Sequence, residues 1–191
     1  MVVLGIDEVG RGCLAGPLVA GAVILKRAIP GVKDSKQLTR IARERLDVVI
    51  RRRAVAYGLG WVEPAELDRL GLTAAVRLAY RRALEGIEIV PDEIIIDGNY
   101  NFLADMPNAR AVIKADAIVP AVSAASIIAK VARDAYMREQ AMQFPLYGFE
   151  RHVGYGTSFH RLALQRHGPC SLHRHSFQPI RLLTDGAYVG D

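Results

Sequence analysis

The stretch Gly5-Ile6-Asp7-Glu8-Val9-Gly10-Arg11-Gly12 decides the fold, because it places two adjacent carboxylates between an apolar run and a glycine-rich turn. The residues around its start predict a buried strand over 2–8. Carboxylates at the end of a buried strand are costly unless their charge is compensated, and a divalent metal ion would compensate it. An acidic turn with no ligand explains the stretch equally well when it is taken alone. The glycines beside the acids let another backbone approach closely.

A dinucleotide-binding fingerprint is not present in this stretch. Gly10, Gly12 and Gly16 approach the pattern, but the last spacing is one residue too long. Residues 17–25 then have the composition of a strand, whereas the fingerprint requires a helix there. We therefore do not expect a nicotinamide or flavin cofactor.

The composition is that of a globular protein, and we expect a single domain over residues 1–191. With 51% hydrophobic and 24% charged residues, disorder is not expected. There is no apolar run long enough to span a membrane and no signal-peptide pattern at the N-terminus. Only two cysteines occur, which favours a reducing, cytoplasmic location over a disulfide framework.

The charge of the chain permits a nucleic-acid partner. The formal net charge is +5, and phosphate contacts dominate binding to nucleic acids. Nearly all of the positive charge is arginine, which indicates either forked contacts to phosphate or codon bias.

The rest of the chain alternates strand and helix patterns, which predicts an α/β fold. A change to glycine-aromatic loops after Pro145 suggests a core over about 1–143 and a substrate-contacting part over about 144–191, with an irregular tail after Gly168. The further strands are expected over residues 17–25 (antiparallel to the first), 54–62, 93–96 and 109–113, and the helices over 40–53, 64–86 in two pieces, 120–143 and about 157–167.

Carboxylates recur at the ends of the predicted strands. Asp97 ends the strand at 93–96, and Asp116 follows the strand at 109–113. If these strands lie beside the first, four acids converge on one edge of the sheet, where mutual repulsion would raise some of their pKa values. Hard cations relieve such repulsion, and two of them can activate a water and stabilise a leaving phosphodiester oxygen. The leading interpretation is metal-assisted phosphodiester hydrolysis.

One difficulty concerns the adjacent acids. Asp7 and Glu8 point to opposite faces of a regular strand. Both can reach one metal pair only if the strand bends, for which Val9 and Gly10 are the candidates, or if Glu8 also offers its backbone carbonyl.

Several other residues allow a functional or a structural interpretation. Lys36 in a polar loop is either a phosphate contact or a solvated charge, and Ser126 in the first turns of the long helix either meets phosphate or packs. Tyr155, between two glycines, is poor core material and would suit stacking on bases or sugars. Four tail residues are of zinc-ligand type, but their spacing matches no common closed site: His167, Cys170, His173 and His175.

Taken together and in order, these motifs resemble bacterial ribonuclease HII over nearly the whole chain. The resemblance rests on residues 5–12 and on Asp34-Ser35-Lys36, Ile96-Asp97-Gly98, Lys114-Ala115-Asp116, Ala124-Ala125-Ser126-Ile127, Tyr147-Gly148-Phe149 and Gly154-Tyr155-Gly156-Thr157. It implies a ribonuclease H-like fold, in which a mixed five-stranded sheet is flanked by helices and followed by a helical C-terminal extension.

The resemblance also implies an activity and its residues. The family cuts the RNA strand of RNA–DNA hybrids and nicks duplex DNA 5′ to embedded ribonucleotides, using two Mg²⁺ or Mn²⁺ ions and leaving 3′-OH and 5′-phosphate ends. It implies Asp116, rather than Asp134 in the long helix, as the fourth acid. Its metal ligands fall on Asp7, Glu8, Asp97 and Asp116, its 2′-OH-reading element on Gly10, Arg11 and Gly12, its junction-sensing tyrosine on Tyr155 rather than Tyr147, and phosphate contacts on Lys36 and Ser126.

The partners implied are RNA–DNA hybrid and ribonucleotide-containing duplex DNA, acted on by a monomer. The extra N-terminal domain of the sister family, ribonuclease HIII, is expected to be absent, since the acidic pair lies almost at Met1. No obvious sliding-clamp peptide ends the chain. Two rival hypotheses are a structure-specific DNA nuclease such as a junction resolvase, and a hybrid-binding module without chemistry.

Overall fold

The structure is a computed structural model that describes residues 1–32, 35 and 38–184. Five strands form one mixed sheet in the order β3-β2-β1-β4-β5. β1 pairs antiparallel with β2 and parallel with β4, so its end lies at the centre of the sheet. The strands are β1 (Val3–Val9), β2 (Leu18–Leu25), β3 (Ala54–Val62), β4 (Glu93–Asp97) and β5 (Ala109–Val112).

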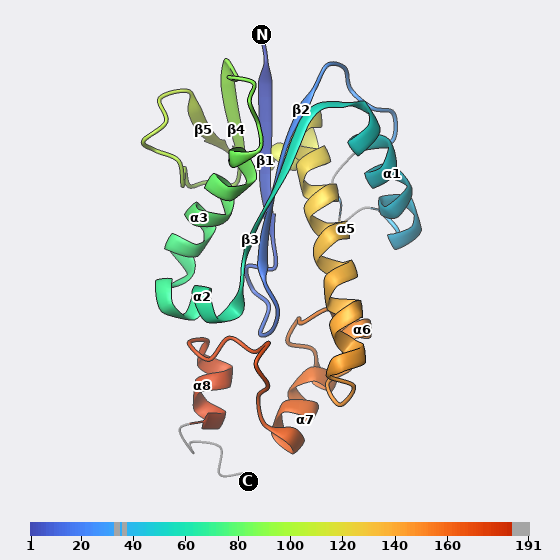
Figure 1. Ribbon diagram of the computed structural model, residues 1–191, viewed down its shortest axis with the longest axis vertical. Coiled ribbons are helices and arrows are strands. Elements are labelled where there is room, and N and C mark those ends of the chain that lie inside the picture. The colour runs from blue at the N-terminus through green and yellow to red at the C-terminus, as the bar shows by residue number, and fades with distance from the viewer. Residues whose placement is uncertain (33–34, 36–37, 185–191) are drawn as a thin grey trace.

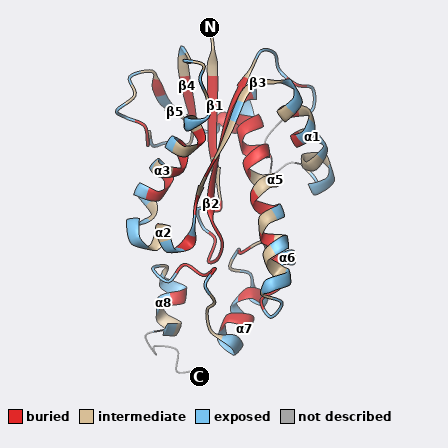
Figure 2. Ribbon diagram, viewed as in Figure 1, coloured by how far each residue is buried: buried red, intermediate tan, exposed pale blue. Residues whose placement is uncertain are grey.

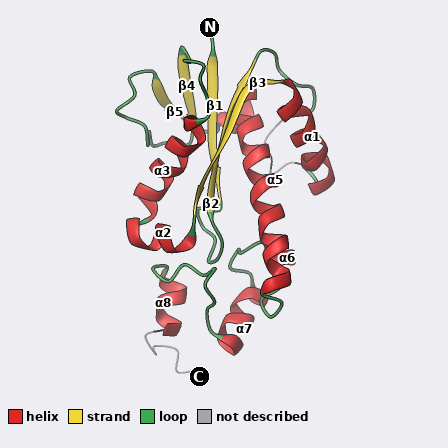
Figure 3. Ribbon diagram, in the orientation of Figure 1, coloured by secondary structure: helices red, strands yellow, loops and turns green. Residues whose placement is uncertain are grey.

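Helices cover the sheet and make up the C-terminal part (Figures 1 and 3). They are α1 (Arg40–Arg53), α2 (Pro64–Leu70), α3 (Leu72–Glu85), α4 (Ala115–Ile118), α5 (Pro120–Gln143), α6 (Phe149–His152), α7 (Ser158–His167) and α8 (Gln178–Thr184). This architecture confirms the predicted α/β class, with its mixed five-stranded sheet and helical C-terminal extension.

Local signals fixed several helix boundaries. The Thr39 hydroxyl accepts a hydrogen bond from the Ala42 amide, and the Thr157 hydroxyl accepts one from the His160 amide, as expected for N-caps. The expectation of an irregular tail after Gly168 was wrong, because α8 lies there. So short a helix is marginal in isolation, and the burial of Ile180 in the C-terminal cluster stabilises it.

Alternate residues of β1 serve the two faces of the sheet. Leu4 and Ile6 join the core beneath α3, which is the largest apolar cluster of the described residues. Gly5 faces α5, where an added Cβ would fall 2.2 Å from the Val122 backbone nitrogen. A glycine is therefore required for α5 to lie against the central strand. Most of β1 and the first half of α5 are buried (Figure 2).

The C-terminal part has an apolar cluster of its own, next to the end of β1. Tyr147 stacks on Phe149 with ring centroids 5.4 Å apart, and both rings are buried. Tyr147 thus serves packing, whereas Tyr155 is 38% exposed. Among the described residues, no helix combines the length and the apolar character needed to cross a membrane.

Candidate active site

The parallel pairing of β1 with β4 brings two of the predicted acids together. Ile6 pairs with Ile96, so the following residues, Asp7 and Asp97, lie next to each other on the two adjacent strands. The Asp116 backbone N–H donates a hydrogen bond to Asp97 Oδ1 at 3.4 Å. Asp7 and Asp97 therefore lie on adjacent strands, and Asp116, within α4, meets Asp97 through its backbone N–H.

Asp7 is costly to ionise where it lies. Burial raises its pKa well above the usual value, and the nearby carboxylates of Glu8 and then Asp97 raise it further. A hydrogen bond from the Ser126 side chain acts in the opposite direction. The ionised Asp7 side chain is thus destabilised by its surroundings, and a bound cation would relieve this electrostatic cost.

Glu8 points to the other face of β1, toward α3. The Tyr80 hydroxyl donates a hydrogen bond to Glu8 Oε2, and Arg11 Nη1 lies 3.5 Å from Glu8 Oε1. Burial nevertheless raises the pKa of Glu8, and Asp97 adds to the effect. The bend considered at Val9 does not occur, because β1 stays paired through Val9. The backbone turns at Gly10, where φ is +88°, after both acids.

A cavity of about 280 Å³ opens beside these acids. Most of the predicted site residues line it, although they come from segments far apart in the chain. The lining is Asp7, Glu8, Val9, Gly10, Arg11, Gly12, Ser35, Asp97, Ser126, Lys130 and Tyr155. Lys36 lies outside the described residues.

Two buried arginines fix the loop that follows β1. Arg133 of α5 donates hydrogen bonds to the carbonyls of Ala15, Pro17 and Val153. Arg174 donates to the carbonyls of Gly16 and Arg11, and its burial lowers its pKa to about 10. These bonds satisfy backbone carbonyls of the loop that follows β1, and Gly10, Arg11 and Gly12 at its start line the cavity.

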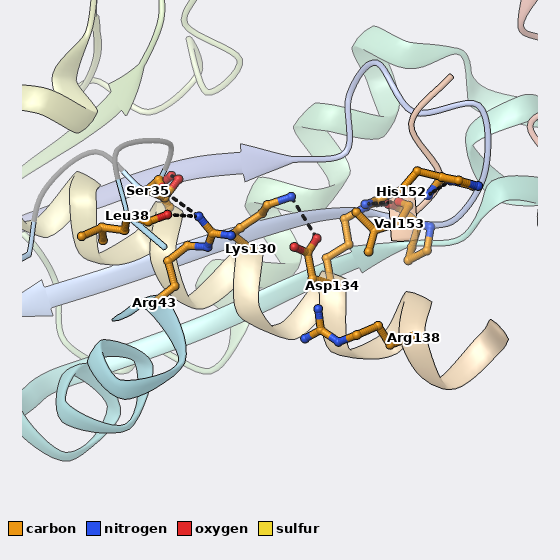
Figure 4. Close-up of polar contacts among 12 residues, drawn as sticks. Ser35, Leu38, Arg43, Lys130, Asp134, Arg138, His152 and Val153 are labelled. Carbon is orange, nitrogen blue, oxygen red and sulfur yellow. Dashed lines mark hydrogen bonds and ion pairs between the residues drawn. The ribbon is translucent and has the colours of Figure 1, made fainter. Parts of the chain in front are cut away.

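The serines and the lysine on the α5 side are also placed by polar contacts. Ser126 and Ser35 exchange a hydrogen bond of 2.9 Å between their hydroxyls, and Arg43 donates to the Ser35 carbonyl at 2.8 Å (Figure 4). Lys130 pairs with Asp134 at 3.0 Å, so Asp134 has a cationic partner within its own helix (Figure 4).

Tyr155 closes the cavity from the C-terminal part. The Lys130 ammonium lies 5.1 Å from its ring centroid, and the Arg133 guanidinium lies 5.9 Å away. Burial and the neighbouring Cys13 raise the pKa of Tyr155 to about 12, so the hydroxyl stays neutral.

A cluster of three buried histidines lies beneath Tyr155. His160 Nε2 is 3.0 Å from His173 Nε2, and His152 stacks on His160 with centroids 4.3 Å apart. The tail residues Cys170 and His173 belong to this hydrogen-bonded cluster. Within the part of the chain that the structure describes, no three His, Cys, Asp or Glu residues form a ready-made metal-binding group, the tail included.

The histidine cluster predicts a loss of stability in mild acid. Burial lowers the pKa of His160 to about 4 and that of His173 to about 3. Between about pH 6.5 and pH 4 the unfolded chain binds more protons, so the free energy of unfolding falls as the pH falls, by up to about 1.4 kcal/mol per pH unit for each histidine. Denaturant unfolding at a series of pH values measures this slope.

The His160→Asn variant isolates this contribution from that of the acids. The raised pKa values of Asp7 and Glu8 act with the opposite sign, because their ionised forms destabilise the fold. We expect the variant to have a shallower slope between pH 6.5 and 4. An unchanged slope would contradict the assignment.

Sequence reasoning missed three residues of this region. Each lies in a helical pattern that predicts a core or surface position, and no local motif marks it; the three are Tyr80, Lys130 and His160. Tyr80 meets Glu8 across 72 positions of the chain. Only the packing of α3, α5 and α7 around the sheet end brings them to the site.

Comparisons with known proteins agree with the geometry. The family model described as Ribonuclease HII matches residues 4–180. The curated Ribonuclease HII of Nitrosococcus oceani is 51% identical over 181 residues, covering 94% of this chain and 90% of that protein. The ribonuclease H2 structure from Pyrococcus horikoshii OT3 superposes with a TM-score of 0.83 at 28% identity, covering 100% of both chains. The RNase HII of the Archaeoglobus fulgidus PCNA:RNase HII complex gives a TM-score of 0.77 at 27% identity, covering 93% of this chain and 96% of that chain.

Proposed function

We propose a specific reaction for this chain, since it belongs to the ribonuclease HII family and is therefore a type HII ribonuclease H that acts on RNA–DNA hybrids. It hydrolyses the RNA strand of hybrids and nicks duplex DNA on the 5′ side of an embedded ribonucleotide, leaving 3′-OH and 5′-phosphate ends. The role is removal of ribonucleotides and RNA primers in the cytoplasm. The observation that carries the proposal is the convergence of Asp7, Glu8 and Asp97 in one cavity with Tyr155.

Asp7, Glu8, Asp97 and Asp116 would hold two divalent ions, Mg²⁺ or Mn²⁺. The donor set fits, since all four offer the oxygen ligands that hard cations take, and the raised pKa values of Asp7 and Glu8 mark charge in need of compensation. When bound, the ions activate a water and stabilise the leaving oxygen. The side chains would close around the ions on binding, and Glu8 would contribute its carboxylate, its backbone carbonyl or both.

The remaining cavity residues would bind and select the substrate. Backbone N–H groups of Gly10, Arg11 and Gly12 would contact the ribose 2′-OH, which distinguishes RNA from DNA. Ser126, and also Lys36, would contact phosphate. The Tyr155 ring would stack on the deoxyribose that follows the ribonucleotide and reject a second 2′-OH there. The position of the Tyr155 ring supports this role, because the ring is at the cavity, partly exposed and close to Lys130.

End-labelled duplexes holding zero, one or four ribonucleotides test this function. With Mg²⁺ or Mn²⁺ we expect a nick 5′ to the single ribonucleotide, a shifted cut in the four-ribonucleotide duplex, and no cut in DNA alone. Equal cleavage of all-DNA or branched substrates would favour a structure-specific nuclease instead. Binding without turnover under any divalent metal would favour a binding module.

We propose that the protein acts as a monomer on duplex substrates. The A. fulgidus relative is recorded in a complex with PCNA. A sliding clamp is therefore a partner to test for this chain, although its sequence does not indicate a clamp-binding peptide.

A further inference from the structure

The backbone just before Tyr155 is strained. Val153 has φ +45° and ψ +38°, in the left-handed region that β-branched residues rarely adopt, and Gly154 follows with φ +89°. At Gly154 an added Cβ would fall 2.2 Å from the Ala15 carbonyl oxygen. Such a conformation persists only when the surroundings hold it, and it is a feature from which a functional role can be inferred.

Hydrogen bonds hold this segment on several sides. Arg133 Nη1 donates to the Val153 carbonyl at 2.8 Å, and the Gly154 N–H donates to His152 Nδ1 at 3.2 Å (Figure 4). His152 Nε2 in turn lies 2.8 Å from the Tyr147 carbonyl, to which it must donate. The Tyr155 backbone contacts the buried His160, whose Nδ1 lies 2.9 Å from the Tyr155 carbonyl oxygen.

The bonding partners fix the protonation of the two deeper histidines. A carbonyl only accepts, so His160 carries its proton on Nδ1 and its Nε2 is an acceptor. His173 Nε2, 3.0 Å away, must then be the donor. His173 Nδ1 is left to accept the Cys170 N–H at 2.9 Å, a closer contact than the 3.3 Å to the Cys170 carbonyl. His160 and His173 thus form a histidine relay, in which each ring nitrogen has one consistent role as donor or acceptor.

We propose that His160, held in its Nδ1–H tautomer by His173, is a positioning residue that sets the placement of Tyr155 and through it the choice of cleavage site. The relay is fully buried, so no water competes for the Tyr155 carbonyl from that side. The proton on His160 Nδ1 is the part of the relay that reaches Tyr155, and the other bonds orient the ring. This inference rests on the proposed function, in which Tyr155 reads the junction.

Two amide substitutions separate the roles of the two ring nitrogens. In His160→Asn the amide nitrogen takes the place of Nδ1 and keeps a donor for the Tyr155 carbonyl, while the contact with His173 is lost. In His160→Gln the amide reaches the Nε2 position and keeps the contact with His173, while the Tyr155 carbonyl loses its donor. The two variants disturb the same buried site, but only one removes the bond to Tyr155.

The readout is the ratio of kcat/KM on a single-ribonucleotide duplex to that on an all-RNA hybrid, with cut positions mapped on the four-ribonucleotide duplex. We expect His160→Gln to change this ratio about tenfold, toward the ratio of Tyr155→Ala, because one lost buried hydrogen bond has an effect of about that size. We expect His160→Asn to keep the ratio near the parent value. Adding His160→Gln to Tyr155→Ala should change the ratio no further, because both act through one ring. Equal ratios in the two His160 variants, or additive effects, would overturn the proposal.

Long-range ¹H–¹⁵N NMR of the unaltered protein at pH 7 tests the relay without any activity. The expected result is a neutral His160 protonated on Nδ1 and a neutral His173 protonated on Nε2. Protonation of His160 on Nε2 would overturn the proposal, even if both variants failed to fold. If the tautomers are as expected while single-ribonucleotide duplexes stay uncut, the proposed function fails and the positioning of Tyr155 by His160 does not.

Discussion

Replacing Asp7 with asparagine is expected to abolish cleavage and to make the metal-free protein more stable. A metal ion held by Asp7, as proposed above, would supply several kcal/mol of transition-state stabilisation, so loss of this proposed ligand should lower kcat/KM by about a thousandfold or more. The raised pKa of Asp7 means that its ionised form destabilises the fold at neutral pH, and that stability returns as the pH falls through that pKa. Asparagine removes the charge at every pH.

The stability gain and the loss of turnover are measured separately. In thermal unfolding without metal, each kcal/mol gained should raise Tm by about 2–4 °C for a chain of this size. The stabilisation that Mg²⁺ or Mn²⁺ gives the parent should shrink in the variant, because the ion loses a ligand. A variant that retained turnover would remove Asp7 from the proposed metal site.

Asp47→Asn is the matched control for this result. Asp47 and Asp7 are both 8% exposed, but Asp47 pairs with Arg51 of α1 at 2.9 Å, away from the cavity. Here the substitution breaks a favourable ion pair, so stability should fall slightly while cleavage stays at the parent level. The same chemical change thus has opposite effects on stability at the two sites. Loss of cleavage in both variants would point to a general effect of removing buried charge.

Gly5→Ala is expected to destabilise the protein by about 3 kcal/mol or more, at the upper end of what overpacking costs. The new Cβ would lie 2.2 Å from the Val122 backbone nitrogen and 2.3 Å from the Ala121 carbonyl carbon. These are backbone atoms and cannot rotate away, so α5 must move from β1. Because α5 carries Ser126 and β1 carries Asp7, we also expect weaker cleavage at temperatures where the variant remains folded.

Gly86→Ala provides the comparison for Gly5→Ala. Gly86 has φ −90° and ψ +6°, and an added Cβ meets nothing within 4 Å among the described residues. Its substitution should leave the free energy of unfolding within about 0.5 kcal/mol of the parent or raise it slightly. Urea unfolding of both variants measures the difference. If Gly5→Ala proved as stable as Gly86→Ala, close approach would not be the reason for glycine in β1.

The fold class followed from local patterns in the chain. Apolar runs that end in acids predicted strands, and the caps Thr39 and Thr157 predicted where two helices begin. The α8 helix escaped this reading, because its seven residues lack a local signal and owe their order to the packing of Ile180. Tyr147 was likewise indistinguishable from a surface aromatic until its ring was seen against Phe149.

By itself the sequence determined that Asp97 ends a strand, since a carboxylate beside a glycine after an apolar run is a pattern within a few residues. The same pattern put Asp7 and Glu8 at the end of β1, which continues to Val9, and it did not predict the short helix α4 that holds Asp116. Only the tertiary structure decided their surroundings: Tyr80 on Glu8 across 72 positions, Arg174 on the Gly16 carbonyl across 158, and the histidines beneath Tyr155. The physical reason is that a buried donor or acceptor takes whichever partner folding brings within reach. No periodicity along the chain encodes a hydrogen bond to a distant backbone carbonyl.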